Sequence, residues 1–297
     1  MKNLGNYMEI KPSEMPLQAD GSVYHLNLHP SELADNVLLV GDPNRVATVS
    51  AFFDTIEVRK SNREINTHTG TYKNKRFTVL STGMGCDNID IVLNELDALV
   101  NIDLEKRCVK KEHKSLNIIR LGTCGGLQPH LDINTFIASA YGLGMDGLLH
   151  YYEHANSFSD SEIDKIFMAK TLWNANFPKP YSVSASPALL EKVAFDMQKG
   201  ITITASGFYA PQCRTLRLPL GMPDFAHRLR DTTAKGLYFT NMEMETSALY
   251  CLSKLLVHNA LTICIIIANR CNGNFSKNYS PAMENLIQLT LDRMAKM

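Results

Sequence analysis

The sequence predicts a single α/β domain with a mixed central β-sheet flanked by helices on both sides. Short apolar segments alternate with helical patterns along most of the chain. Several of these segments are apolar on both faces, which is typical of strands covered by helices on each side of a sheet. Glycine-rich turns follow three of the expected strands. Because open α/β sheets bind ligands at the carboxyl ends of their strands, these turns mark the edge where a site is expected.

The first part of the chain predicts one α/β unit and then a group of short strands. The apolar run Val37–Val40 is followed by Gly41, Asp42 and Pro43. Asp42 suits the N-cap of a helix and Pro43 its first position, so a helix is expected over about 43–53. Further strands are expected at Ile56–Lys60, Arg63–Thr67, Gly70–Tyr72 and Phe77–Leu80, a helix at Ile89–Val100, and a solvated charged stretch at Glu105–Lys114.

The second part continues the alternation. The expected strands are Ile118–Gly126, Asn134–Ala140, Ile201–Ala205, Leu237–Thr240 and Leu261–Ala268. Helices are expected from Ser186 to Gly200, over Asp224–Lys235 and Met242–His258, and from Ser280 to the C-terminus. The polar, irregular segment His154–Tyr181 is expected to be a surface excursion.

Composition bounds the class of protein. Of the 297 residues, 45% are hydrophobic, enough for a sizeable core, and the formal net charge is zero, which gives no electrostatic argument for nucleic acid or an anionic membrane. The cysteines are scattered, without CxxC spacing, as reduced thiols of a cytoplasmic protein are. The longest apolar run, near Ile263–Ala268, is too short to span a bilayer. We expect an N-terminal arm over residues 1–21, one domain over 22–297, and a cytoplasmic location.

Three strand-end turns carry ingredients of an anion site: Gly41 with Arg45, Ser81–Gly85, and the segment from Arg120 to Gly126. Backbone N–H groups, arginine forks and the Thr123 hydroxyl suit a small oxyanion. Neither a triphosphate P-loop nor a dinucleotide fingerprint matches, so free phosphate is the obvious candidate. The alternative is a tight turn with a buried, ion-paired Arg120.

A second constellation combines an aromatic ring, an amide and a guanidinium at Phe208, Gln212 and Arg214. An amide both donates and accepts hydrogen bonds, and a guanidinium only donates, which fits the imide edge of a pyrimidine base. An aromatic ring can pack on the base. The alternative is an ordinary aromatic turn with an exposed amide and guanidinium.

A third constellation places two carboxylates, Glu243 and Glu245, at a strand-to-helix junction. A carboxylate can accept hydrogen bonds from vicinal sugar hydroxyls, with Met244 against the sugar face. Stabilisation of acidic residues by the helix dipole is the alternative. Phosphate, sugar and pyrimidine-like sites together describe a nucleoside.

In this combination the chain resembles the uridine phosphorylases of the nucleoside phosphorylase-I family. The matching segments stand in the family's order and cover most of the chain. They are Tyr24–Leu26, Gly41–Arg45, Asn62–Glu64, Ser81–Gly85, Arg120–His130, Phe208–Arg214, Asn241–Glu245 and Ala268–Arg270. The longer segments Asn101–Lys114 and His154–Tyr181 resemble the eukaryotic forms, which are dimers. The resemblance therefore implies a homodimer with shared active sites.

The resemblance also implies roles for individual residues. It assigns phosphate binding to Gly41, Arg45, Arg120 and Thr123, with Arg63 contributed by a neighbouring subunit. It assigns ribose binding to Thr123, Met244 and Glu245, with His25 contributed by a neighbouring subunit. It assigns base binding to Phe208, Gln212, Arg214 and Arg270. Arg45, Arg120, Thr123, Gln212 and Arg214 are the predicted catalytic group.

The implied reaction is that of a pentosyltransferase in pyrimidine salvage: uridine and phosphate give uracil and ribose 1-phosphate, reversibly. Neither a metal nor an organic cofactor is expected. Inorganic phosphate takes part as a co-substrate. Two alternatives remain open, a related phosphorylase acting on purine nucleosides or thymidine, and a nucleoside-binding homologue without turnover.

Overall fold

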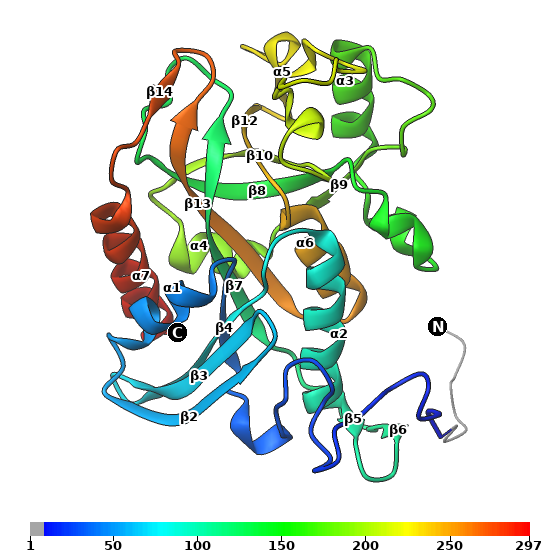
Figure 1. The fold of residues 1–297 in the computed structure, drawn as a ribbon, viewed down its shortest axis with the longest axis vertical. Helices are drawn as coiled ribbons and strands as arrows, with labels where there is room; N and C mark the ends of the chain where they lie inside the picture. Colours follow the sequence, from blue (N-terminus) through cyan, green and yellow to red (C-terminus); the bar gives the residue numbers. More distant parts are fainter. Residues whose placement is uncertain (1–8) are drawn as a thin grey trace.

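The computed structural model describes residues 9–297, so the first eight residues of the expected N-terminal arm lie outside the described part. The rest of that segment lies against the turn at Arg107, whose guanidinium donates to the carbonyl of Ile10 and whose carbonyl accepts from the Ile10 N–H. Figure 1 shows the chain folded around one strongly twisted sheet.

The elements alternate along the chain much as expected. The larger strands are β1 (Asn36–Val40), β2 (Thr55–Asn62), β3 (Ile65–Tyr72), β4 (Lys75–Ser81), β7 (Asn117–Gly126), β8 (Phe136–Gly144), β9 (Tyr181–Ser184), β10 (Gln198–Thr204), β12 (Leu237–Glu243) and β13 (Asn259–Asn269). The short ones are β5 (Ile102–Asp103), β6 (Cys108–Val109), β11 (Thr233–Ala234) and β14 (Asn274–Phe275). The helices are α1 (Pro43–Ser50), α2 (Cys86–Asn101), α3 (Ser161–Thr171), α4 (Pro187–Val193), α5 (Phe225–Arg228), α6 (Thr246–Leu255) and α7 (Ser280–Met294). Within residues 9–297 the short 3-10 helices are η1 (Pro30–Glu32), η2 (Leu148–Tyr151), η3 (Ala155–Phe158) and η4 (Ala210–Gln212).

The sheet is mixed, as predicted, and part of it closes on itself. β1 pairs in parallel with both β4 and β7, and β7 pairs in parallel with β13. β13 then pairs with β8, β8 with β10, β10 with β12, and β12 returns to β7 in antiparallel fashion at Gly125 and Gly126. The long central strand β7 therefore belongs both to the open sheet and to the closed ring.

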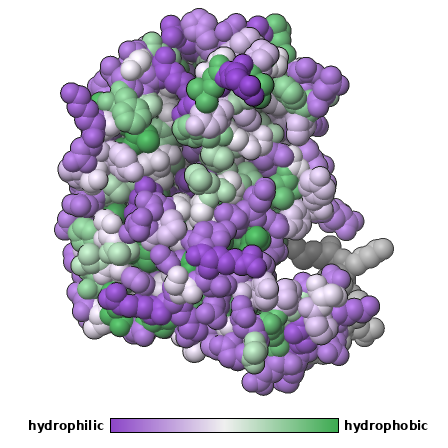
Figure 2. All heavy atoms as spheres, in the orientation of Figure 1, coloured by the Kyte–Doolittle hydropathy of each residue, from purple (hydrophilic) through white to green (hydrophobic). Residues whose placement is uncertain are grey.

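Helices cover the sheet on both sides. α2 packs on α6, and α6 on β8 and β13; α1, α4 and α7 form the opposite layer, where α4 also contacts β13 (Figure 1). The buried hydrophobic residues form one large, mainly aliphatic cluster and two smaller ones, and β1, β7 and β13 are almost fully buried. On the face drawn in Figure 2, hydrophobic residues are scattered in small groups among polar ones. Within residues 9–297, no helix combines the length and apolar character needed to cross a membrane.

Several predicted elements need correction. The segment expected to be an irregular excursion contains α3, which begins at an N-cap, Asp160, whose side chain accepts from the N–H groups of Glu162 and Ile163. The helix expected over 224–235 ends at Arg228, because the chain then turns and pairs Thr233–Ala234 with β12. The strands expected at 63–67 and 70–72 are one strand, β3, while Arg63 itself lies in the turn before it with a φ of 53°.

Gly200 is not a helix end but lies inside β10. α4 already stops at Val193, shorter than expected. A Cβ at Gly200 would stand 2.2 Å from the hydroxyl oxygen of Thr240 on the neighbouring strand, so the glycine allows a close strand approach. β12 also runs on to Glu243, and α6 starts at Thr246 rather than near 242.

Candidate active site

The carboxyl ends of β1, β4, β7 and β12 meet around a cavity of about 560 Å³. The sequence-predicted residues that line it are Gly41, Arg45, Arg120, Thr123, Phe208, Gln212, Arg214, Met244 and Glu245. The cavity is also lined by residues for which the sequence motifs predict no role, including Glu64, Cys124, Glu243, Ile267, Phe275 and Tyr279. The structure thus gathers predicted sites from distant parts of the chain into one cavity.

The glycine turns form part of the cavity wall. The Asp42 side chain accepts from the Asn44 N–H and starts α1, whose first turn carries Arg45. Arg45 Nη1 donates to the carbonyl of Leu121 at 3.3 Å, which ties this turn to β7. Gly83 has a φ of 70°, a conformation that favours glycine, and its carbonyl lies 3.5 Å from where a Cβ of Gly41 would stand. The first two turns are therefore in contact, with Arg45 beside them.

Arg120 is buried at the centre of the site. Its Nη2 donates to Glu245 Oε2, and its Nη1 lies 3.2 Å from Glu243 Oε2. The two carboxylates raise the pKa of this guanidinium, although burial opposes them, so Arg120 stays charged. A Cβ at Gly122 would stand 2.3 Å from Nη1, so glycine at this position of β7 makes room for the guanidinium.

The two carboxylates differ in their surroundings. Glu245 Oε1 accepts from the Gly85 N–H at 2.8 Å, which links it to the turn after β4. Glu243 accepts from the Thr204 hydroxyl at 2.8 Å and from the N–H groups of Glu245 and Thr246. Burial raises the pKa of Glu243 to about 7, and neighbouring Glu245 adds to the rise, although Arg120 lowers it. Glu243 is therefore a carboxyl that can change protonation near neutral pH.

A second group of lining residues, called the base end below, carries the amide and guanidinium groups. Gln212 is 3% exposed, and its Oε1 accepts from Arg214 Nη1 at 2.7 Å and from Arg270 Nη2 at 3.5 Å. The Arg214 Cζ lies 3.6 Å from the centroid of the Phe208 ring, a close cation–π contact. Burial, together with the charge of Arg270, lowers the pKa of Arg214 to about 10. Arg270 follows the end of β13 and contacts Gln212, and it is not among the described residues that line the cavity.

His25 and Arg63 lie together outside this cavity. Among the described residues that line it, neither is present. The His25 Nδ1 is 2.6 Å from Glu95 Oε1, and its carbonyl accepts from the Asn62 amide at 2.9 Å. Arg63 is exposed, with its Cζ 5.9 Å from the centroid of the Tyr24 ring. The structure therefore places this pair on a surface, near each other and apart from the other predicted site residues.

Glu243 and Cys264 both lie against Arg120, a contact that the sequence motifs did not predict for either residue. The motif around Glu245 also contains Glu243, so the sequence marks the presence of a second carboxylate. Nothing in the motif shows that the two carboxylates share Arg120. Cys264 lies on β13, and its Sγ is 3.6 Å from Arg120 Nη1. No local pattern marks Cys264, because only the pairing of β13 with β7 brings it to Arg120.

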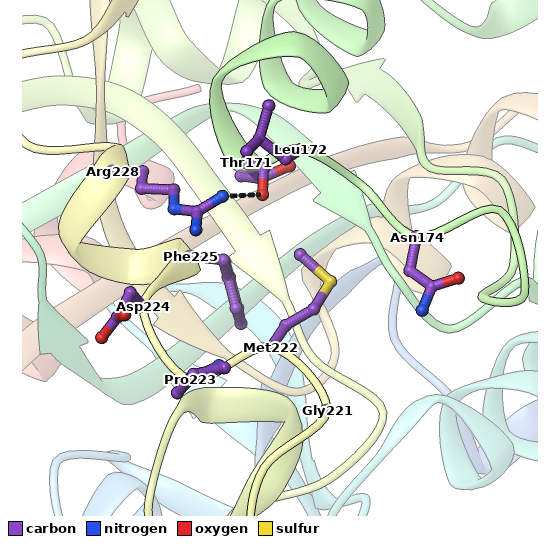
Figure 3. A pocket seen from close by; sticks show the side chains of 9 residues that line it. All are labelled: Thr171, Leu172, Asn174, Gly221, Met222, Pro223, Asp224, Phe225 and Arg228. Carbon is purple, nitrogen blue, oxygen red and sulfur yellow. Dashed lines mark hydrogen bonds between the residues drawn. The ribbon is translucent and has the colours of Figure 1, made fainter.

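A second hollow lies where α3 and α5 meet (Figure 3). Arg228 donates from Nη1 to the Thr171 carbonyl at 3.1 Å, and Phe225, Met222 and Asn174 surround the opening. Among the described residues, this hollow shares no lining residue with the larger cavity. It lacks the convergent charged groups of that cavity, so it is not the candidate active site.

Asp97, His113 and His258 place possible metal-ligating atoms within 4.8 Å of one another. The Leu116 N–H donates to His258 Nδ1 at 3.2 Å, however, so the proton of the neutral ring is on Nε2. His258 Nε2 faces Asp97 Oδ1 at 3.3 Å and has no lone pair for a metal in this state. This cluster is therefore a poor fit to a metal ion.

Comparison with known proteins agrees with the geometry. Residues 35–296 match the Phosphorylase superfamily. A uridine phosphorylase of Thermococcus kodakarensis is 29% identical, over 89% of this chain and 84% of that protein. A DeoD-type purine nucleoside phosphorylase of Alkaliphilus metalliredigens is 27% identical, over 84% of this chain and 88% of that protein.

Solved structures give the same result. A Trypanosoma brucei nucleoside phosphorylase that shows uridine phosphorylase activity is 31% identical, with a TM-score of 0.88, covering 95% of this chain and 100% of that one. A Toxoplasma gondii purine nucleoside phosphorylase is 20% identical, with a TM-score of 0.66 over 94% of this chain and 98% of that one, a likeness of fold alone. Because the family match spans most of the sequence, the chain belongs to the phosphorylase superfamily.

Proposed function

We propose that this protein is a uridine phosphorylase, a pentosyltransferase that converts uridine and phosphate into uracil and ribose 1-phosphate, and the reverse. One observation carries the proposal. A single cavity is lined both by Arg45, Arg120 and Thr123 and by Gln212 with Arg214. A nucleoside that binds together with an anion calls for both groups in one cavity. The similarity to proteins named uridine phosphorylase supports the choice of base.

Phosphate needs positioning more than activation, because it is already anionic at neutral pH. Arg45 and Arg120 would hold it by charge-assisted hydrogen bonds, with Thr123 and the turn at Gly41 beside them. Held below C1′ of the sugar, it would attack as the glycosidic bond loosens towards an oxocarbenium-like state. A phosphate placed in this way gives ribose 1-phosphate directly.

The ribose would lie between the phosphate and the base. Glu245 is fixed by Arg120 and by the Gly85 N–H, so its carboxylate is oriented before a ligand arrives. It would accept from the sugar hydroxyls, with Met244 packed against the sugar face and Thr123 close to it. Such pre-orientation reduces the cost of ordering the substrate.

The base end would stabilise the departing uracil. Negative charge develops on the ring as the glycosidic bond breaks, and donors aimed at this charge lower the barrier. Arg214 supplies a guanidinium that is already held by Gln212 and by the Phe208 ring. Phe208 would pack against the base, and Arg270 would support Gln212 from behind. No metal or organic cofactor is required for these steps.

His25 and Arg63 fit the proposal only if two subunits share each site. Both lie on a surface away from their own cavity, near Tyr24 and Asn62. In a homodimer, each subunit would lend Arg63 to the partner's phosphate and His25 to the partner's ribose. Such an isologous arrangement gives two equivalent sites. We further propose a cytoplasmic enzyme of pyrimidine salvage.

Two other functions compete with this one. A relative acting on purine nucleosides or thymidine is favoured by similarity to purine nucleoside phosphorylases, and a binding protein without turnover would share the fold. Incubation with uridine, inosine or thymidine and phosphate, followed by measurement of free base, separates them. We expect uracil from uridine well above hypoxanthine from inosine. Preferred release of hypoxanthine or thymine would reassign the base, and no release of any base would leave a binding protein.

A further inference from the structure

Two carboxylates share one guanidinium at the centre of the cavity. Glu243 Oε2 lies 3.2 Å from Arg120 Nη1, and Glu245 Oε2 accepts from Nη2. All three side chains are about 95% buried, with exposures of 4% for each residue. With both carboxylates ionised, this group carries one net negative charge beside the place where an anion must bind. Like charges at such distances in a buried site disfavour each other.

The guanidinium is also largely occupied. Besides Glu243, its Nη1 faces Cys264 Sγ at 3.6 Å, while Nη2 holds Glu245. Nε is buried and has no hydrogen-bond partner among the described residues. A bound anion therefore competes with two carboxylates for Arg120. Neutralising one of the carboxylates removes both the surplus charge and part of the competition.

The hydrogen bonds around Glu243 leave room for a proton on one of its oxygens. Its Oε1 is 2.8 Å from the Thr204 hydroxyl oxygen, which accepts from the Ser247 N–H and has a second lone pair that can accept from a protonated Oε1. The Thr246 N–H lies 3.1 Å from both carboxylate oxygens, so it stays satisfied by Oε2 when Oε1 carries the proton. The raised pKa of Glu243, about 7 through burial, agrees with this geometry.

Other titratable groups near Glu243 do not compete for that proton. Burial raises the pKa values of the Cys86 thiol on α2, the Cys124 thiol on β7 and the Tyr250 phenol on α6, and the Glu243 carboxylate adds to each. These three groups are therefore neutral around pH 7. Arg120 on β7 is charged at the same pH. From β10, Thr204 contributes only its hydroxyl.

We infer that Glu243 is a positioning residue that couples anion binding to proton uptake: the cavity gains a proton on Glu243 Oε1 as a dianion binds beside Arg120. This inference rests on the anion site of the proposed function and deepens it. The proton comes from solvent, and no covalent bond other than O–H forms or breaks. Glu243 thus sets how much of the Arg120 charge is available to the anion at a given pH.

Sulfate is the suitable probe, because it stays a dianion across the neutral range and is not a substrate. Calorimetry on the whole protein would give its Kd from about pH 7 to about pH 9. A coupling of about 5- to 150-fold, acting on a group with a pKa of about 7, predicts that the wild-type Kd rises about 3- to 30-fold over this range. At about pH 8, titrations in two buffers of different ionisation enthalpy would count the protons, and we expect uptake of about 0.2 to 0.9 protons per sulfate in the wild type.

Glu243→Gln should bind sulfate with a Kd that changes less than about twofold over the same pH range, because it cannot ionise. Asp164→Asn is the matched control. Asp164 is also buried and has a pKa raised by burial, but it bonds to Ser159 and Ser182, away from Arg120. The control variant should keep the wild-type pH dependence.

A flat wild-type profile with no proton uptake overturns the inference, and this outcome needs no variant to fold. Equal pH dependence in Glu243→Gln also overturns it, by moving the proton to another group. If the wild type binds no sulfate at any pH, there is no anion site beside Arg120, and the inference is overturned. Proton-coupled sulfate binding in a protein that releases no base would uphold the inference while refuting the phosphorylase proposal.

Discussion

The amide oxygen of Gln212 lies 2.7 Å from Nη1 of Arg214, so the two side chains that face the proposed base hold each other in place. The same guanidinium donates to the Phe208 carbonyl at 2.6 Å and lies over the Phe208 ring. Because the amide oxygen receives Arg214 and also Arg270, the amide nitrogen is left to donate to a ligand. The base end is therefore one connected unit rather than three independent contacts.

Gln212→Leu should sharply reduce uridine turnover. It removes the amide that pairs with the base and leaves a polar group of the base unpaired, at a cost of about 1–3 kcal/mol. We expect kcat/KM for uridine to fall about 5- to 150-fold, since about 1.4 kcal/mol corresponds to tenfold. Steady-state assays with uridine would measure it. Gln198→Leu, at an exposed site on β10, is the control and should leave kcat/KM unchanged. An unaltered kcat/KM in Gln212→Leu would show that Gln212 does not contact the base.

Mixing two inactive variants, Arg63→Ala and Arg120→Ala, should restore activity if subunits share each site. In a mixed dimer, one site would carry both lesions and the other neither. When equal amounts pair at random, about half of the dimers are mixed, and half of the sites in a mixed dimer are intact. Activity should therefore return to about a quarter of the wild-type value. Activity after verified subunit exchange is the measurement.

Arg45→Ala mixed with Arg120→Ala is the control for this experiment. Both arginines line the same subunit's cavity, so a mixed dimer would have no intact site and should stay inactive. If the Arg63 and Arg120 variants exchange subunits and recover nothing, Arg63 acts within its own subunit, and the shared-site proposal is wrong.

Gly142→Ala should destabilise the protein. The added Cβ on β8 would stand 2.9 Å from Thr246 Cγ2 and 3.0 Å from the Ser247 backbone nitrogen, at the start of α6. Overpacking of this kind costs about 1–3 kcal/mol, which lowers Tm by about 2–5 °C for a domain of this size. Thermal unfolding would measure the change. In Gly221→Ala the nearest atom is Phe177 Cζ at 3.6 Å, an ordinary contact, so its Tm should not change. Equal Tm values for Gly142→Ala and wild type would refute the close packing of α6 on β8.

Local signals in the sequence were sufficient for much of the fold. Asp42 and Pro43 start α1 where capping preferences place it, and the apolar runs at β1, β7 and β13 are strands. Failures occurred where tertiary pairing overrode the local pattern. The residues after Arg228 turn into β11 because β12 offers them a strand partner. Helix α3 was missed because its surroundings are polar and irregular.

The candidate site was predictable to the extent that each motif carried its own chemistry. Arg120, Gln212 and Glu245 could be selected from strand-end turns and from the family pattern, and the structure brings them into one cavity. The contacts of Glu243 and Cys264 with Arg120 could not be selected, because they depend on β12 and β13 both lying beside β7. Such contacts between distant strands have no local signature.

The central claim is that phosphate is the acceptor of the sugar, so its most direct test compares uridine cleavage with and without phosphate. In buffer with phosphate, we predict uracil and ribose 1-phosphate in equal amounts, measured together by chromatography. In phosphate-free buffer, uracil release should fall to background, since the arginines of the cavity would have no nucleophile to position. Uracil release at an undiminished rate without phosphate, with free ribose as the second product, would contradict the account and make the protein a nucleosidase.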